Sequence, residues 1–138
     1  MSAPTPQVQP SATDRASRRA ARVRACWPGV RVESALLTTS ADGDHGHVVV
    51  QLGGLTPADV RVELIPVDAE LAEHCPRGGY RLFSSQAYGN GCFVFEVALP
   101  SGSADRGSEW IVHVHPVDAD EGTRVEFHVQ PRAGGARR

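Results

Sequence analysis

Three histidines near the C-terminus have the spacing of a metal site. His113 and His115 lie two residues apart in the alternating stretch WIVHVHPV, so both imidazoles fall on one side of a predicted strand. His128 follows on the polar face of the next alternating stretch, TRVEFHVQ. Imidazoles on neighbouring strands could bind Zn²⁺. The same positions are also the polar face of strands whose other face is apolar, and we adopt that interpretation and predict no metal site.

Other reactive groups do not combine into an active site. Cys75 follows His74 directly, and neighbours in sequence seldom act together as nucleophile and base. The stretch ADGDHGH, residues 41–47, lacks the spacing of an EF-hand loop and is typical of a solvated hairpin turn. The carboxylates of Asp118 and Asp120 fall in another turn, without the cleft that glycosidases need. No catalytic residue is predicted, and we do not expect an enzyme acting alone.

The chain contains no lysine, because all 14 of its basic residues are arginine. A Schiff base with pyridoxal phosphate needs a lysine amine, and so does a phosphate-binding P-loop. The sequence therefore excludes both chemistries within this chain, and no cofactor is predicted.

Arginines gather in the stretch DRASRRAARVRACW, residues 14–27. Ser11 followed by Asp14 predicts a capping box at the start of a helix. A narrow apolar stripe at helical spacing is formed by Ala16, Ala20, Val23 and Trp27. So thin a stripe must pack on a larger body, either of this chain or of a partner, and Trp27, Arg18 and Arg22 are the candidate docking residues. A nucleic-acid arm is not expected, because interleaved aromatic residues are missing.

After Gly29 the apolar period changes from helical to two. About seven short alternating stretches follow, and Tyr88-Gly89-Asn90-Gly91 carries a hairpin signal. We predict an all-β fold, an immunoglobulin-like antiparallel β-sandwich of about seven strands preceded by one N-terminal α-helix. The expected segments are a disordered tail at 1–12, a basic amphipathic helix at 13–28, the β-sandwich at 29–131 and a disordered basic tail at 132–138.

The stretch LGGLTPADVRVEL, residues 52–64, is predicted to shape the domain rather than to do chemistry. Gly53 and Gly54 end one strand at a bend, and Pro57 fixes φ for the turn. Asp59 is expected to accept a backbone N–H, after which Val60 restarts the alternation.

Composition indicates a globular protein of the reducing cytoplasm. No apolar run approaches the roughly 20 residues of a membrane span, and the N-terminal stretch lacks the pattern of a secretory signal. The three cysteines form no CxxC pair. Among the few aromatic residues, Tyr80, Phe83 and Tyr88 lie outside the apolar patterns, and Tyr80 and Tyr88 are candidates for contact with a glucan. Ordinary aromatic residues of turns are the alternative.

Three segments together resemble the C-terminal end of bacterial and archaeal-type alpha-glucan phosphorylases. They are RVRACWPGVRV, LGGLTPADVRVELIPV and WIVHVHPVD, which span most of the chain. The second contains the pattern GL-x-P-x-DV-x-V-x-L, which small heat-shock proteins share, whereas the helix ending at Trp27 and the late V-x-P strand favour the phosphorylase tail. The family performs phosphorolysis of α-1,4-glucans with pyridoxal phosphate, but its catalytic lobes and cofactor lysine are missing here.

The resemblance implies a non-catalytic accessory or docking β-sandwich linked to glycogen or maltodextrin metabolism. Its partner would be a phosphorylase catalytic body or an α-glucan, and the chain would be a remnant or one piece of a split enzyme. Two alternatives remain open at this point, a stand-alone carbohydrate-binding module and a chaperone-like sandwich of the small heat-shock type.

Overall fold

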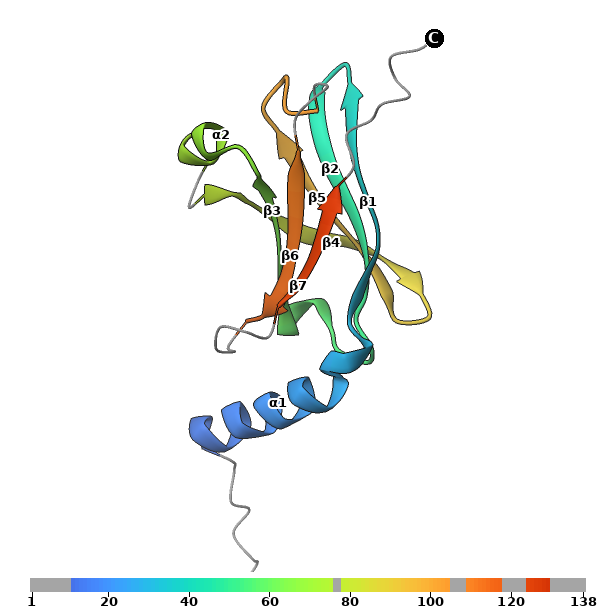
Figure 1. Cartoon of the computed structure of the whole chain (residues 1–138). Coiled ribbons are helices and arrows are strands. Elements are labelled where there is room, and N and C mark those ends of the chain that lie inside the picture. Colours follow the sequence, from blue (N-terminus) through green and yellow to red (C-terminus); the bar gives the residue numbers. More distant parts are fainter. Residues whose placement is uncertain (1–10, 76–77, 105–108, 118–123, 130–138) are drawn as a thin grey trace, which may run out of the picture.

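The computed structural model of the chain describes residues 11–75, 78–104, 109–117 and 124–129 (Figure 1). The helical elements are α1 (Ala12–Cys26), the 3₁₀ turns η1 (Trp27–Gly29) and η2 (Pro57–Asp59), and the short helix α2 (Ala69–Glu73). The strands are β1 (Arg31–Ser40), β2 (Gly43–Gln51), β3 (Val60–Pro66), β4 (Tyr80–Gly89), β5 (Cys92–Leu99), β6 (Trp110–Pro116) and β7 (Val125–Val129). The predicted tails lie outside the described residues, except that α1 already begins at Ala12, and the predicted helix overlaps α1 and η1.

The seven strands form one sheet in the order β1-β2-β5-β4-β3-β6-β7, with every neighbouring pair antiparallel. The sheet coils until β1 and β7 come side by side, which nearly closes a barrel. The long strand β4 joins the two parts of the sheet, because its first residues pair with β3 and its later residues pair with β5. The predicted antiparallel β fold with a preceding helix is confirmed, while its assignment as an immunoglobulin-like sandwich stays a prediction.

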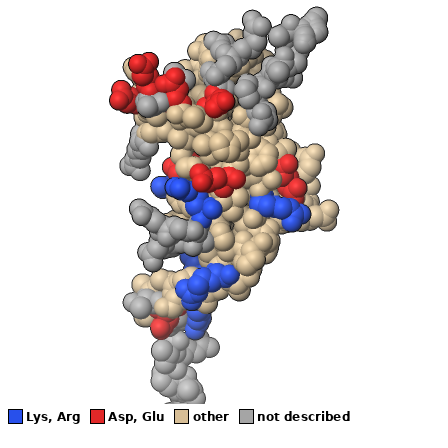
Figure 2. All heavy atoms as spheres, in the orientation of Figure 1, with Lys and Arg blue, Asp and Glu red and all other residues tan. Residues whose placement is uncertain are grey.

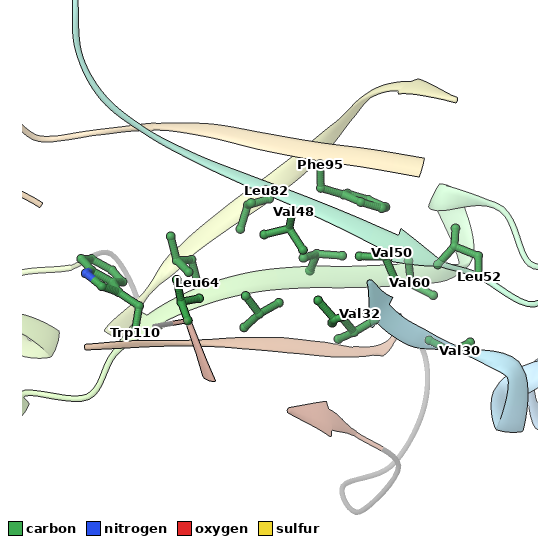
Figure 3. Close-up of a cluster of buried hydrophobic side chains, with 14 of the residues drawn as sticks. Val30, Val32, Val48, Val50, Leu52, Val60, Leu64, Leu82, Phe95 and Trp110 are labelled. Atoms are coloured by element: carbon green, nitrogen blue, oxygen red, sulfur yellow. The ribbon is translucent and has the colours of Figure 1, made fainter. Parts of the chain in front are cut away.

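The hydrophobic core lies inside the coiled sheet. It is formed by the apolar residues that alternate with polar residues along the strands. Along β3 and β6 every second side chain is buried, beginning with Val60 and Trp110. Figure 3 shows the side chains of Val48, Leu64 and Leu82 filling the space between the strands. The inward faces expected from the sequence are therefore confirmed for these strands.

The hairpin between β4 and β5 is the one that the sequence predicts. Gly89 and Cys92 pair across it, so Asn90 and Gly91 form a two-residue turn. Both turn residues have positive φ, 54° and 82°, as a type I′ turn requires.

The predicted turn at residues 41–47 is wrong in its extent. Strand β2 already begins at Gly43, and the backbone of residues 43–47 pairs with β1 on one side, and from Asp44 onward with β5 on the other. Gly46 is not a turn residue but faces the core, where a Cβ would lie 2.9 Å from Leu64 Cδ2. The need for space opposite Leu64 explains a glycine in the middle of a strand.

Candidate functional site

Residues 52–59 form the seat of α1, which is the surface that the C-terminal end of this helix contacts. Gly53 has φ of 60°, and a Cβ built on it would lie 2.9 Å from the Cys26 carbonyl oxygen and 3.2 Å from Gly29 Cα. Only a residue without a side chain allows the two backbones to approach so closely. The glycine that the sequence explains by a bend is therefore also a contact point for the end of the helix.

Asp59 is the polar centre of this seat and has only 1% of its surface exposed. Its Oδ1 accepts a hydrogen bond of 2.7 Å from Arg22 Nη2 and lies 3.4 Å from Arg19 Nε. Its Oδ2 accepts hydrogen bonds from the Thr56 backbone N–H at 3.0 Å and from the Thr56 hydroxyl at 3.1 Å. The expected backbone contact of Asp59 is confirmed, but its contact with Arg22, 37 residues away in the chain, could not be predicted from the sequence.

These contacts keep Asp59 ionised. Burial alone raises the pKa of the Asp59 carboxyl, because a charge is poorly solvated inside the protein. The hydrogen bonds from Thr56 and the Arg22 guanidinium outweigh burial and hold its pKa below the ordinary value. The seat therefore binds α1 through a charged carboxylate.

The apolar part of the seat involves the last residues of α1. Val23 is buried, and Cys26 and Trp27 are partly buried against the core. Of the three candidate docking residues, Trp27 and Arg22 thus contact this chain's own barrel, whereas Arg18 is exposed.

The N-terminal half of α1 does not share this packing. Ala16 and Ala20, the other members of the predicted apolar stripe, are exposed. Figure 1 shows α1 running away from the lower end of the barrel, and Figure 2 shows arginines along it and acidic side chains over α2. The capping box holds the free end, since Ser11 Oγ accepts a 3.1 Å bond from the Asp14 N–H. A helix that is anchored at one end and has Arg15 and Arg18 exposed toward the other end can present these arginines to a partner.

The three histidines of the hypothetical zinc site do not share a ligand position. His113 contacts Glu126 at 3.1 Å and His115 contacts Glu63 at 3.0 Å, while His128 lies opposite Ile111. Within the described ranges, no group of three histidine, cysteine or acidic side chains could hold a metal ion. On the outer face of β3, β6 and β7, His113 and His115 each pair instead with a glutamate.

His113 is the histidine most affected by its surroundings. Burial lowers its pKa, and the positive charge of Arg124 lowers it further. The carboxylate of Glu126 acts in the opposite direction without reversing the result. His113 is therefore held mainly neutral near pH 7, as expected of a structural side chain on a half-buried face.

The two candidate glucan-contact residues lie at opposite ends of β4. Tyr80 is half-buried and packs on Trp110 with ring centroids 6.2 Å apart. Burial raises the pKa of Tyr80, and a hydrogen bond with Cys75 adds to the effect. Tyr88 is 66% exposed, and Phe83 is 61% exposed with the Arg81 guanidinium 4.9 Å from its ring centroid. The structure thus brings Phe83, rather than Tyr80, onto the surface with Tyr88.

The remaining candidates for chemistry are placed as structural groups. His74 Nδ1 lies 2.7 Å from the Glu70 carbonyl oxygen, whereas the Cys75 side chain hydrogen-bonds with Tyr80. Asp44, which the sequence predicts in a turn, is a buried residue of β2 and accepts a hydrogen bond of 2.8 Å from the Ala104 N–H. This hydrogen bond is the main reason why the pKa of Asp44 is lowered. Asp118 and Asp120 lie outside the described residues.

Searches with protein-family models, among curated proteins and among solved structures find no match to this chain. In the part of the chain that the structure covers, no helix is long and apolar enough to cross a membrane.

Proposed function

We propose that this chain is a non-catalytic docking domain of the cytoplasm, attached through α1 to a larger protein of alpha-glucan metabolism. The proposal rests on a difference between the two halves of α1. Its C-terminal half is fixed to the barrel by Asp59, while its N-terminal half extends into solvent with exposed arginines such as Arg18. A rigidly anchored, projecting charged helix is suited to orient a domain on a partner.

The contacts at Asp59 support the relation to the tail of alpha-glucan phosphorylases. The helix end RVRACWPG and the segment LGGLTPAD meet through Arg22 and Asp59, and again through Gly29 and Gly53. The segment with the V-x-P pattern joins them, because the Val117 N–H donates to the Asp59 carbonyl oxygen at 3.1 Å. All three segments that carry the resemblance therefore meet around Asp59. Such contacts are expected if the three segments were inherited together from one ancestral domain.

The strand order supports the immunoglobulin-like assignment. In constant-type immunoglobulin domains, strands A, B, E and D form one sheet and C, F and G form the other. The order β1-β2-β5-β4 followed by β3-β6-β7 follows the same sequence of strands. The contact between β3 and β4 covers three residue pairs and links the two groups.

The test is binding to an alpha-glucan phosphorylase from which the C-terminal β-rich tail has been removed. Calorimetric titration of that protein with the purified chain should give one-to-one binding. The substitution Arg18→Glu should weaken it at least about tenfold, a loss of about 1.4 kcal/mol. Arg24→Glu, on the other side of α1, should change it little. Absence of heat, or equal losses for both substitutions, would contradict docking through α1.

A second candidate function is glucan binding without a protein partner. It is favoured by the exposure of Phe83 and Tyr88 on one strand, since exposed aromatic rings can stack on sugar rings. Titration with maltoheptaose should then give heat that is lost in Phe83→Ala and Tyr88→Ala but retained in Leu36→Ala, which removes another exposed apolar side chain. No heat at high ligand concentration would remove this candidate.

A further inference from the structure

An open hollow lies along the N-terminal half of α1, on the side that continues toward the barrel. Its volume is about 490 Å³, and its lining includes Ala12, Arg15, Ala16, Arg18, Arg19 and Arg22. Arg19 and Arg22 reach Asp59 from this side of the helix. Residues three, four and seven positions earlier share the same side, which places Ala12, Arg15 and Ala16 in line with them. The hollow thus lies on the side of α1 from which Arg19 and Arg22 reach Asp59.

The lining combines arginine and alanine side chains of α1. Arg15 and Arg18 are exposed, and the side chains of Arg19 and Arg22 are 41% and 54% exposed although they contact Asp59. Guanidinium groups bind carboxylates through paired hydrogen bonds. Ala12 and Ala16 leave room for another backbone to approach the helix. The site already shows this chemistry once, because Arg22 binds the carboxylate of Asp59 at 2.7 Å.

From this arrangement we infer that the hollow binds an acidic segment of a partner protein. The segment carries two or more carboxylates on one side, spaced to meet successive arginines of α1, and its backbone lies over Ala12 and Ala16. The inference rests on the proposed docking function and names the chemistry of the surface that docks.

The composition of the hollow favours a protein segment over a nucleic acid. Proteins that bind single strands stack bases on exposed aromatic rings. The aromatic residue of the helix end, Trp27, is partly buried against the core and is not among the lining residues.

The experiment measures binding of a short fluorescein-labelled peptide that repeats Glu-Ala-Ala-Glu, using anisotropy and the full chain. We expect saturable binding that weakens at least about tenfold in the double variant Arg15→Gln, Arg18→Gln. Arg24→Gln is the control for each single substitution, Arg15→Gln and Arg18→Gln, because it removes one charge from α1 about 140° around the helix from Arg19. It should change the affinity less than twofold. Circular dichroism of each variant verifies that α1 is intact.

A second variant tests the hollow itself rather than its charge. Ala16→Trp places a large side chain in the lining of the hollow and keeps every arginine, so it should also weaken peptide binding at least about tenfold. Full affinity in Ala16→Trp, equal losses in Arg24→Gln, or no binding of the peptide would each overturn the inference. Tighter binding of a single-stranded oligonucleotide, with the same dependence on Arg15 and Arg18, would overturn it in favour of nucleic acid.

The same variant separates this inference from the proposed function. If the truncated phosphorylase binds wild type and Ala16→Trp equally, docking stands and the hollow is not its site. If the peptide binds in the hollow but the phosphorylase does not bind at all, the acidic site stands and the proposed partner is wrong.

Discussion

The two halves of α1 are built from the same residue types but stand in different surroundings. Both contain arginines and alanines at helical spacing. In the C-terminal half, Arg22 and Val23 are held by Asp59 and by the core. In the N-terminal half, Ala16 and Arg18 are exposed, and the capping box of Ser11 closes the end.

This difference shows that contacts with residues 52–59, and not the apolar stripe along α1, determine which part of the helix packs on the barrel. A methyl group offers little apolar area, so Ala16 and Ala20 add little to docking on the barrel. Asp59 offers a buried carboxylate and Gly53 a place for close approach, and both face only the last two turns of the helix. The anchored half should therefore contribute to the stability of the whole domain and the projecting half should not.

The largest effect is expected from Asp59→Ala. It removes the partner of Arg19 and Arg22 and leaves the Thr56 N–H without its acceptor. Breaking a fully buried ion pair destabilises by roughly 3–5 kcal/mol, and the half-exposed side chains of Arg19 and Arg22 reduce this figure. We expect a loss of about 2–3 kcal/mol in the free energy of unfolding, measured by urea denaturation.

Asp59→Asn is the matched control for this substitution. It keeps an acceptor for Thr56 but removes the charge that holds Arg22. Its loss should be smaller than that of Asp59→Ala. A loss below about 0.5 kcal/mol in Asp59→Ala, the size of an ordinary surface substitution, would show that the anchored half is no more important than the projecting one.

Gly53→Ala should have the next largest effect. The residue has positive φ, and its new Cβ would meet the backbone of Cys26 and Gly29. The left-handed conformation alone costs about 1–2 kcal/mol for a residue other than glycine. Gly89→Ala isolates that cost, because Gly89 has φ of 93° and open space around the new Cβ. Gly53→Ala should destabilise more than Gly89→Ala, and equal losses would mean that the contact with α1 contributes nothing.

Patterns that depend on near neighbours could be predicted from the sequence. The alternation of Val60, Val62 and Leu64 fixed the inward face of β3, and the Asn90-Gly91 pair fixed the hairpin turn. The capping box of Ser11 and Asp14 is likewise local and is confirmed. Each of these features is decided by backbone preferences within a few residues.

Features that depend on contacts between distant segments could not be predicted. Nothing near Asp59 in the sequence shows that Arg22 lies against it, and nothing near Gly46 shows Leu64 opposite. For the same reason Gly46 suggested a turn and Tyr80 suggested a surface aromatic. Such contacts arise only when the strands are assembled, which is why the candidate site emerged from the fold.

A smaller effect than that of either substitution is expected from protonating Asp59 at low pH. Its pKa is lower in the folded state than its ordinary value of 3.8, so the folded state binds protons less readily than the unfolded chain. The resulting stabilisation is fully present above the ordinary pKa and is lost as pH falls through the folded value. Protonated Asp59 still fills its site and bonds Thr56, so the loss should be less than in Asp59→Ala.

Urea denaturation at several pH values below about 5 measures this loss. The decline in unfolding free energy should be shallower in Asp59→Asn than in wild type. Asp44, whose pKa is also lowered, provides the remaining slope in that variant. Identical slopes in the two proteins would show that the charge of Asp59 does not hold the helix.

The smallest effect on global stability is expected from Ser11→Ala. The change removes the acceptor for the Asp14 N–H, which typically costs a helix about 1 kcal/mol. Because the projecting half makes little contact with the barrel, the loss should stay local, with faster hydrogen exchange at Asp14 and Arg15. The free energy of global unfolding should change by less than about 0.5 kcal/mol. A global loss approaching that of Gly53→Ala would mean that the two halves of α1 unfold together with the barrel and that the projecting half is not a separate docking element.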